Sequence, residues 1–273
     1  METGKANNRK TANFNIALAE QYHLAVQIGN KELSYCIINT KTKTVEYFNS
    51  YIIDNNITSI LNYDDIIKID FQSSSLAFLG SASTLVPNSI YTKNDSKDLL
   101  ELNIAQSVII KYDNVNKIDA HTIYSVSENL NDIVNTYFPK AKQKAQQSIL
   151  LEQFSMLDNS NQSAYLFIND NNINITIFNN QKLIFNNSFD FVTKEDLLYF
   201  TLFSFEQLKI ETESVIVKVY GSISEEDENY KILYNYIRNI RLGSRTNELK
   251  FTSEFDTIQE HQYFGLFCQV LCE

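Results

Sequence analysis

The chain has 273 residues, of which 44% are hydrophobic and 21% are charged, a balance typical of a globular protein rather than a disordered one. Its net charge of -10 opposes nucleic acid and anionic lipid on average, so a nucleic-acid partner is not expected. With only 6 Gly, the sequence contains no glycine-rich phosphate loop of the G-x-x-x-x-G-K or G-x-G-x-x-G kind.

The sequence predicts neither a secretion signal nor a membrane span. Residues 1–14 are polar and are expected to form a flexible N-terminal tail. No apolar run approaches the roughly 20 residues that a membrane helix needs. The three cysteines, Cys36, Cys268 and Cys272, lack metal-ligand spacing and favour free thiols in a reducing compartment. We therefore expect a cytoplasmic protein.

Three short runs with strand character follow the tail, at Leu24–Gly29, Leu33–Thr40 and Val45–Ile53. In the first run, large apolar residues alternate with smaller or polar ones, which is the period of a strand. Because only short polar turns separate the runs, the simplest pairing is an antiparallel meander.

A second trio of strand-like runs begins near residue 164, at Ala164–Asn169, Ile173–Asn179 and Lys182–Phe191. A shift of 140 residues superposes the first two runs of the trios, and a turn shorter by two places Asn49–Tyr51 on Asn187–Phe189. This match indicates an internal duplication. Two unrelated meanders are the alternative.

Helical patterns follow the first trio. Ser127 is placed to cap a helix with apolar residues at helical spacing, and Pro139 ends it. A second helix is expected from about Ala145 to Leu157. The polar stretch at residues 158–163 then marks a boundary.

Helical patterns also follow the second trio. Thr193 and Asp196 have the spacing of a capping box, and the helix after them is apolar nearly all round, which predicts burial between layers. A strand at Ser214–Tyr220 and a helix capped by Ser224 complete this half.

These elements predict a mixed α/β fold of two lobes. Hairpins followed by strand–helix alternation predict, in each half, a mixed sheet with three leading antiparallel strands and helices packed on it. The expected division is a tail at residues 1–14, a first lobe at residues 15–160 and a second lobe at residues 161–273.

The repeated order of three strands and then helix–strand–helix resembles the actin-like superfamily, whose ribonuclease H-like lobes also occur in sugar kinases and heat-shock ATPases. The details are most similar to a bacterial domain of unknown function within it, through Thr84–Tyr91, Asn187–Phe189, Lys194–Tyr199, Tyr220–Ser222 and Tyr234–Ile237. The resemblance covers about residues 15–270, and it implies a nucleotide cleft between the two lobes.

The resemblance also implies Asp-x-Gly at the end of the first strand of each half, where the acid organises Mg²⁺ and the glycine lets backbone N–H groups approach phosphate. The first half keeps Gly29 but has Gln27 in place of the acid. The second half has Asp170 in a shifted frame and no glycine. The candidate cleft residues are Gly29, Asn30, Asn169, Asp170, Gly221 and Ser222, the last two matching the adenosine-side turn.

Loss of these elements removes hydrogen bonds to phosphate that are each worth about 1.5–3 kcal/mol. We therefore expect a non-catalytic, degenerate actin-like protein without metal or cofactor. It would act as a protein-binding or scaffold module through its surface or its cleft, with another protein or a second copy as partner. The alternative is an ATPase or kinase that binds ATP and Mg²⁺ and whose acid has moved to Asp170.

Two basic runs leave nucleic acid open as a third alternative. Lys140, Lys142 and Lys144 form one run, and Arg238, Arg241 and Arg245 form the other. The aromatic residues of a stacking platform are missing beside the lysines, which favours solvated helix surface.

Overall fold

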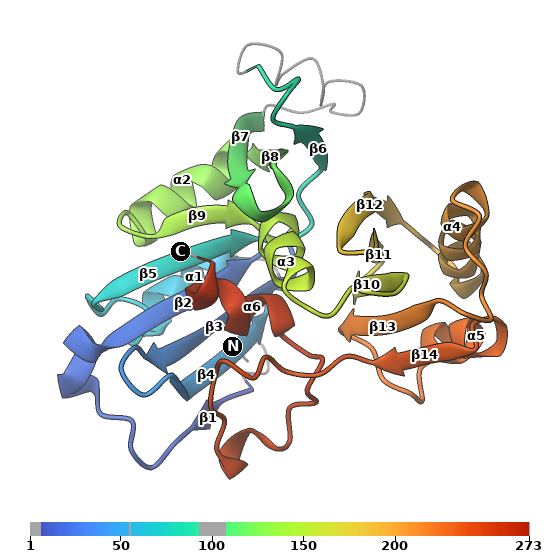
Figure 1. The fold of residues 1–273 in the computed structure, drawn as a ribbon. Coiled ribbons are helices and arrows are strands. Elements are labelled where there is room, and N and C mark those ends of the chain that lie inside the picture. Colours follow the sequence, from blue (N-terminus) through green and yellow to red (C-terminus); the bar gives the residue numbers. More distant parts are fainter. Residues whose placement is uncertain (1–6, 55, 93–107, 273) are drawn as a thin grey trace.

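The computed structural model describes residues 7–54, 56–92 and 108–272, which form two lobes with one main sheet each (Figure 1). The first sheet has the order β1-β4-β3-β2-β5-β9, with β1 (Arg9–Lys10), β2 (Tyr22–Ile28), β3 (Glu32–Asn39), β4 (Thr44–Ile52), β5 (Ser73–Phe78) and β9 (Lys142–Ala145). The second sheet has the order β12-β11-β10-β13-β14, with β10 (Ser163–Asn169), β11 (Asn172–Asn179), β12 (Lys182–Asp190), β13 (Ile216–Gly221) and β14 (Asn239–Leu242).

A third, smaller sheet lies above the first lobe in Figure 1 and has the order β6-β8-β7, with β6 (Ser83–Pro87), β7 (Val108–Val115) and β8 (Ala120–Ser127). The α-helices are α1 (Ile57–Tyr63), α2 (Glu128–Tyr137), α3 (Gln146–Ser155), α4 (Lys194–Gln207), α5 (Glu228–Tyr236) and α6 (Phe264–Cys268). Within the described ranges, none of these helices is both long and apolar enough to cross a membrane.

The two main sheets repeat one topology, which confirms the predicted duplication and the mixed α/β fold. In each, three antiparallel strands are followed by two parallel ones, in the order β4-β3-β2-β5-β9 and β12-β11-β10-β13-β14. The register shifts between Ile37 and Ile38 in one sheet and between Ile177 and Phe178 in the other. These two irregularities stand 140 residues apart, which is the offset that the sequence predicts.

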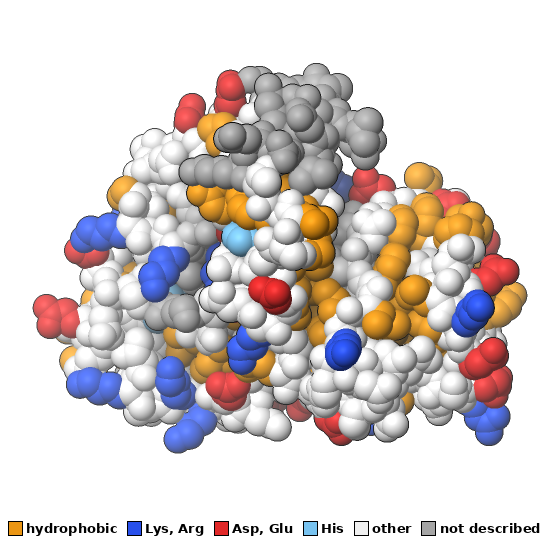
Figure 2. Space-filling model, turned by 45° about the horizontal axis from the view of Figure 1, so that its top comes forward, with side chains coloured by type: hydrophobic (Ala, Val, Ile, Leu, Met, Phe, Trp, Pro, Cys, Tyr) orange, Lys and Arg blue, Asp and Glu red, His pale blue; other side chains and the backbone are white. Residues whose placement is uncertain are grey.

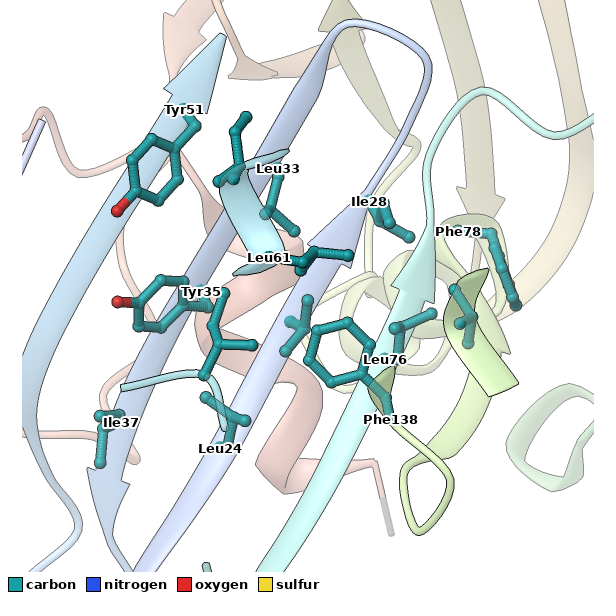
Figure 3. Packing of buried hydrophobic residues seen from close by; sticks show 14 of the residues in the cluster. Leu24, Ile28, Leu33, Tyr35, Ile37, Tyr51, Leu61, Leu76, Phe78 and Phe138 are labelled. Carbon is teal, nitrogen blue, oxygen red and sulfur yellow. The ribbon is translucent and has the colours of Figure 1, made fainter. Parts of the chain in front are cut away.

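The first core lies on one face of the sheet formed by β2, β3 and β5 (Figure 3). Leu24, Ile28 and Leu76 point from the strands toward Leu61 of α1 and toward Phe138, the residue that follows α2. Burying each such side chain stabilises the fold by about 1.5–3 kcal/mol. The predicted helix cap is also present, because the Leu130 N–H donates to Ser127 Oγ at 3.3 Å.

The C-terminal segment covers the opposite face of the first sheet. Phe255, Leu266 and Phe267 pack against Cys36 and Phe48 in one buried cluster. In Figure 1 the chain accordingly leaves β14 in the second lobe and ends beside the first. The residues expected as a second lobe, 161–273, therefore include a stretch that packs on the first sheet.

The chain just before β2 is also held on the first sheet. Arg9 of β1 pairs with Phe48, and the Thr11 N–H donates to the Glu46 carbonyl at 2.9 Å. Phe14 is buried beside Tyr22, with their ring centres 5.6 Å apart. Residues 7–14 of the expected flexible tail thus form an edge strand and a hydrophobic contact.

The prediction that α4 is buried between layers is wrong. Leu197 and Phe205 of this helix are buried, but Tyr199 and Phe203 are exposed. The helix lies on the outer face of the second sheet beside α5, so only its inner side contacts the core.

The predicted cap of the next helix is also wrong. Helix α5 begins at Glu228 with Asp227 as its N-cap residue. Instead of capping, Ser224 donates its backbone N–H to Asp227 Oδ2 at 3.2 Å. Residues 225–227 therefore form a turn between Ser224 and the start of the helix.

Candidate functional site

The duplicated hairpins place the predicted cleft residues opposite one another. Strands β2 and β10 are the central strands of their sheets, and each ends in a tight turn to its antiparallel neighbour. Between the two turns lie a cavity of about 350 Å³ and an adjoining one of about 50 Å³. Gly29, Asn30, Asn169 and Asp170 line the larger cavity, and Asn169, Gly221 and Ser222 line the smaller.

The turn after β2 uses its backbone donor internally. The Gly29 N–H donates to the Glu32 carbonyl at 2.9 Å, which closes the hairpin. A Cβ on Gly29 would lie 3.0 Å from Leu79 Cβ, so close packing alone accounts for the glycine. This N–H is not free to bind phosphate.

The turn after β13 is also closed by internal hydrogen bonds. Gly221 has φ of +100°, and its N–H donates to the His261 carbonyl at 3.1 Å. The Ser222 N–H donates to the Ile168 carbonyl at 2.8 Å, and Ser222 Oγ donates to Asn169 Oδ1 at 3.2 Å. The turn therefore ties β13 to β10 and to the C-terminal segment instead of offering donors to a ligand.

Asp170 occupies the turn between β10 and β11 in the left-handed region, with φ of 48°. Short polar residues tolerate this conformation, which explains how the turn forms without glycine. Asp170 lines the larger cavity together with Glu32, and its charge acts on the Glu32 carboxyl. The shifted acid of the sequence analysis is therefore in the cleft.

Glu32 is a further acid in the cleft, and it lines both cavities. Gln27 Nε2 donates to Glu32 Oε1 at 3.1 Å, and the Ser34 hydroxyl donates to the same oxygen. Burial raises the pKa of the Glu32 carboxyl above its ordinary value, the two hydrogen bonds lower it, and the charge of Asp170 raises it. A carboxyl held in this way binds a proton more readily than a free one.

The helix α3 supplies the floor of the cleft. Gln146 and Gln147, in its first turn, line the larger cavity. Gln147 Nε2 donates to the Ser81 carbonyl at 3.3 Å, but the buried Oε1 has no partner among the described residues. Buried polar atoms are normally hydrogen-bonded, so this acceptor is suited to a donor group that enters the cleft.

These residues do not fit a triphosphate with its metal ion. The larger cavity has three carboxylates, Glu32, Asp170 and Asp190, against the single cation Lys31. Across the described ranges, no three His, Cys, Asp or Glu side chains are grouped as they would be to hold a metal. Negative lining and engaged backbone donors both oppose phosphate.

A family model described as "Protein of unknown function (DUF3822)" matches residues 11–240. The chain belongs to the DUF3822 family. None of the curated proteins compared with the chain matches it.

Solved structures place the DUF3822 chain in the actin-like fold. A protein from Bacteroides thetaiotaomicron, described as having an actin-like ATPase fold and unknown function, superposes with a TM-score of 0.77 at 19% identity, over 84% of this chain and 93% of that one. The PilM–PilN type IV pilus biogenesis complex superposes with a TM-score of 0.62 at 9% identity, over 92% of this chain and 98% of that one. The predicted actin-like lobes are thereby confirmed.

Glu32 is a cleft residue of the DUF3822 chain that was not predicted from the sequence. The sequence does contain a signal for it, because residues 32 and 34 share one face of β3 and residue 34 pairs with Gln27 of β2. The absence of an acid at position 27 and the presence of one on the same face of the next strand could therefore have predicted Glu32 as the cleft acid.

The structure separates the two basic runs. Lys140 bonds to Asp70 at 2.6 Å, and Lys144 bonds to Glu152 at 3.0 Å. Arg238 forms a surface ion pair with Glu213. Arg241 and Arg245 line a pocket outside the cleft, which Lys218 also lines.

Proposed function

We propose that this DUF3822 protein is a non-catalytic, degenerate actin-like protein of the cytoplasm that acts as a protein-binding or scaffold module. The observation that carries the proposal is the state of the glycine turns. The backbone N–H groups of Gly29, Gly221 and Ser222 are all engaged within the chain. For these groups to donate to phosphate, the hydrogen bonds that close the β2–β3 hairpin and that tie β13 to β10 and the C-terminal segment would have to break.

The contents of the cleft support a peptide or small polar ligand over a nucleotide. Its rim carries exposed amides, Asn30 from the first lobe and Asn171 from the second. Amide side chains both donate and accept, as a peptide backbone requires. The unpartnered Oε1 of Gln147 adds a buried acceptor for a donor from such a ligand.

The outer surface of the second lobe supports protein binding independently. Hydrophobic side chains gather over this lobe at the right of Figure 2. The most exposed ones near α4 and α5 are Val192, Tyr199, Phe203, Tyr234 and Tyr236. Exposed aromatic side chains are enriched at protein interfaces.

The similarity to the PilM–PilN complex is consistent with this proposal. That structure shows an actin-like protein assembled with a protein partner. At 9% identity it lends only the fold, so neither pilus biogenesis nor the particular partner is carried over to this chain.

The first test is thermal unfolding with and without Mg·ATP. A ligand present at 100 times its Kd stabilises a protein by about 2.7 kcal/mol. We expect no shift at millimolar Mg·ATP. A saturable upward shift, or ATP turnover reduced by Asp170→Asn in a folded variant, would establish the ATPase or kinase alternative instead.

The second test compares proteins captured from native cells by the wild type and by a cleft variant. The variant Asn30→Arg/Asn171→Arg places two large cations on opposite rims of the cleft. Its control, Asn129→Arg/Asn135→Arg, adds the same two positive charges on the exposed side of α2. A partner lost with the cleft variant and kept with the control assigns binding to the cleft. Loss with neither variant assigns it to the outer surface, and a chain that captures no partner contradicts the scaffold proposal.

A further inference from the structure

A second pocket lies away from the inter-lobe cleft and shares no lining residue with its two cavities. It has a volume of about 520 Å³ and lies between the end of α3, the strands β13 and β14, and the segment after β14. Figure 1 shows that this segment is where the chain leaves the second lobe and crosses back to the first. Ligand pockets commonly have volumes of about 300–1,000 Å³.

Two cations stand side by side in this pocket because of the strand register. Lys218 of β13 pairs with Arg241 of the parallel strand β14. The neighbours Val217 and Val219 face the core under α4 and α5, so Lys218 projects from the opposite face of the sheet. Like charges at neighbouring positions on a sheet face destabilise it.

Nothing in the described ranges neutralises this pair through an ion pair. Neither Lys218 nor Arg241 forms a salt bridge there, although the chain as a whole carries a net charge of -10. Lys218 Nζ lies 5.7 Å from the ring centre of Tyr165, and burial together with the charge of Arg241 lowers its pKa. Asp158 opposes this shift from outside the pocket.

The remaining polar groups of the pocket include further donors. Arg245 donates to the carbonyls of Phe255 and Ile258, while its buried Nε has no partner among the described residues. Ser244, Thr246 and Asn247 add hydroxyl and amide groups, and Glu248 is the acid of the lining. The three cations therefore exceed the acids of the lining by two charges.

We propose that this pocket binds a phosphorylated small molecule, with Lys218 and Arg241 holding its phosphoryl group. A dianion matches two adjacent cations, and its several oxygens match a guanidinium and neighbouring hydroxyl donors. Phosphate alone would leave much of the volume empty. The apolar side chains of Met156, Leu157 and Phe264 form a wall for the rest of the molecule.

This site is independent of the proposed scaffold function. Its ligand would contact the end of α3, the second sheet and the crossing segment together, so binding would affect how the two lobes are held to each other. Failure of one proposal leaves the other standing, because the two sites share no residue.

The test is calorimetric titration of the full chain with pyrophosphate, in the absence of Mg²⁺ and at constant ionic strength. We expect saturable binding to the wild type and about a tenfold or greater loss of affinity in both Lys218→Met and Arg241→Gln. The matched control is Arg238→Gln, which removes an arginine close in sequence that is paired with Glu213 on the surface. Its affinity should equal that of the wild type.

Two further readouts separate binding from folding. Without ligand, Lys218→Met should unfold at the same temperature as the wild type or higher, because it relieves the repulsion from Arg241. Malonate, a dicarboxylate, should bind at least tenfold more weakly than pyrophosphate. Absence of saturation by pyrophosphate, an equal loss in Arg238→Gln, or equal binding of malonate would each overturn the proposal.

Discussion

Gln27 and Glu32 together set the chemistry of the first hairpin. An amide at position 27 donates to the Glu32 carboxyl, whereas an acid there would repel it. The acid of this hairpin is therefore Glu32 on β3 and not residue 27 on β2, and its carboxyl is partly buried in the sheet. Where the actin-like pattern would place an acid, β2 therefore carries an amide that is hydrogen-bonded to Glu32 of β3.

Gly221 is the glycine whose conformation the cleft requires. Its φ is +100°, and a Cβ would lie 1.9 Å from the Ile168 carbonyl oxygen. We predict that Gly221→Ala lowers the free energy of unfolding by about 3 kcal/mol or more, since a backbone contact cannot be relieved by side-chain rotation. Urea unfolding measures the loss.

Gly80 is the matched control for that change. It also has a positive φ, of 63°, but a Cβ there would meet no atom within 4 Å. Gly80→Ala should therefore cost only the strain of the left-handed region, about 1–2 kcal/mol. Equal losses in the two variants would contradict the role of the Ile168 contact.

We predict that Asp113 makes the stability of the protein depend on pH. Its Oδ2 accepts hydrogen bonds from the Ala145 N–H and Ser148 Oγ, both at 2.7 Å, and so holds the start of α3 from a different sheet. Burial raises the pKa of this carboxyl to about 6, although these hydrogen bonds lower it in part. The stability linked to its protonation is therefore complete below about pH 4 and is lost as the pH rises through about 6.

Asp113→Asn should remove this dependence. We expect the unfolding free energy of the variant, relative to the wild type, to rise by up to about 3 kcal/mol between about pH 4 and about pH 8. Ser148→Ala, which removes a hydrogen bond that lowers the pKa, should move the wild-type transition to higher pH. A difference between Asp113→Asn and the wild type that is constant across this range would refute the assignment.

At the scale of the element, local sequence specified the ends of helices where the capping side chain was adjacent. Thr193 accepts from the Asp196 N–H at 3.1 Å and Asp196 accepts from the Thr193 N–H at 2.9 Å, as their spacing predicts. Helix α3 shows the limit of such reasoning. Its N-cap residue, Ala145, makes no side-chain cap, and the start of the helix is held instead by Asp113, which lies 33 residues before Gln146, so no local pattern could reveal it.

Thr193→Ala tests the capping box of α4. The change leaves the Asp196 N–H without its acceptor at an exposed helix end, so we predict a loss of about 1 kcal/mol in the free energy of unfolding. Urea unfolding at neutral pH measures it. Thr136→Ala, in the last turn of α2 where the hydroxyl only bonds back to the Asp132 carbonyl, should change stability by less than about 0.5 kcal/mol.

The exposed side of α4 shows a second limit of local sequence reasoning. Tyr199 and Phe203 stack with ring centres 5.5 Å apart on the surface, and the sequence of the helix does not distinguish them from core residues. Whether an apolar residue is buried depends on how many layers cover the sheet, which is a property of the whole chain. The strand order was predictable for the opposite reason, since short turns leave few ways to connect neighbouring strands.

At the scale of the molecule, the C-terminal segment joins the lobes. Its Phe267 is buried beside Phe48 and Phe251, with ring centres 6.0 and 5.1 Å away. The first sheet therefore depends on residues that the chain reaches only after completing the second. Residue order alone would assign the segment to the second lobe, because the long-range contact leaves no local signal.

Phe267→Ala should consequently weaken the first lobe, although the residue follows the second in sequence. We predict a loss of about 3–5 kcal/mol from removing this buried ring. Hydrogen exchange locates the loss: amides of β2, β3 and β4 should exchange faster, whereas those of β10 and β11 should not. Phe205→Ala, which removes a buried ring from the second core, should give the reverse pattern. Equal acceleration in both sheets would mean that the lobes open as one unit, and it would rule out the segment as a support specific to the first.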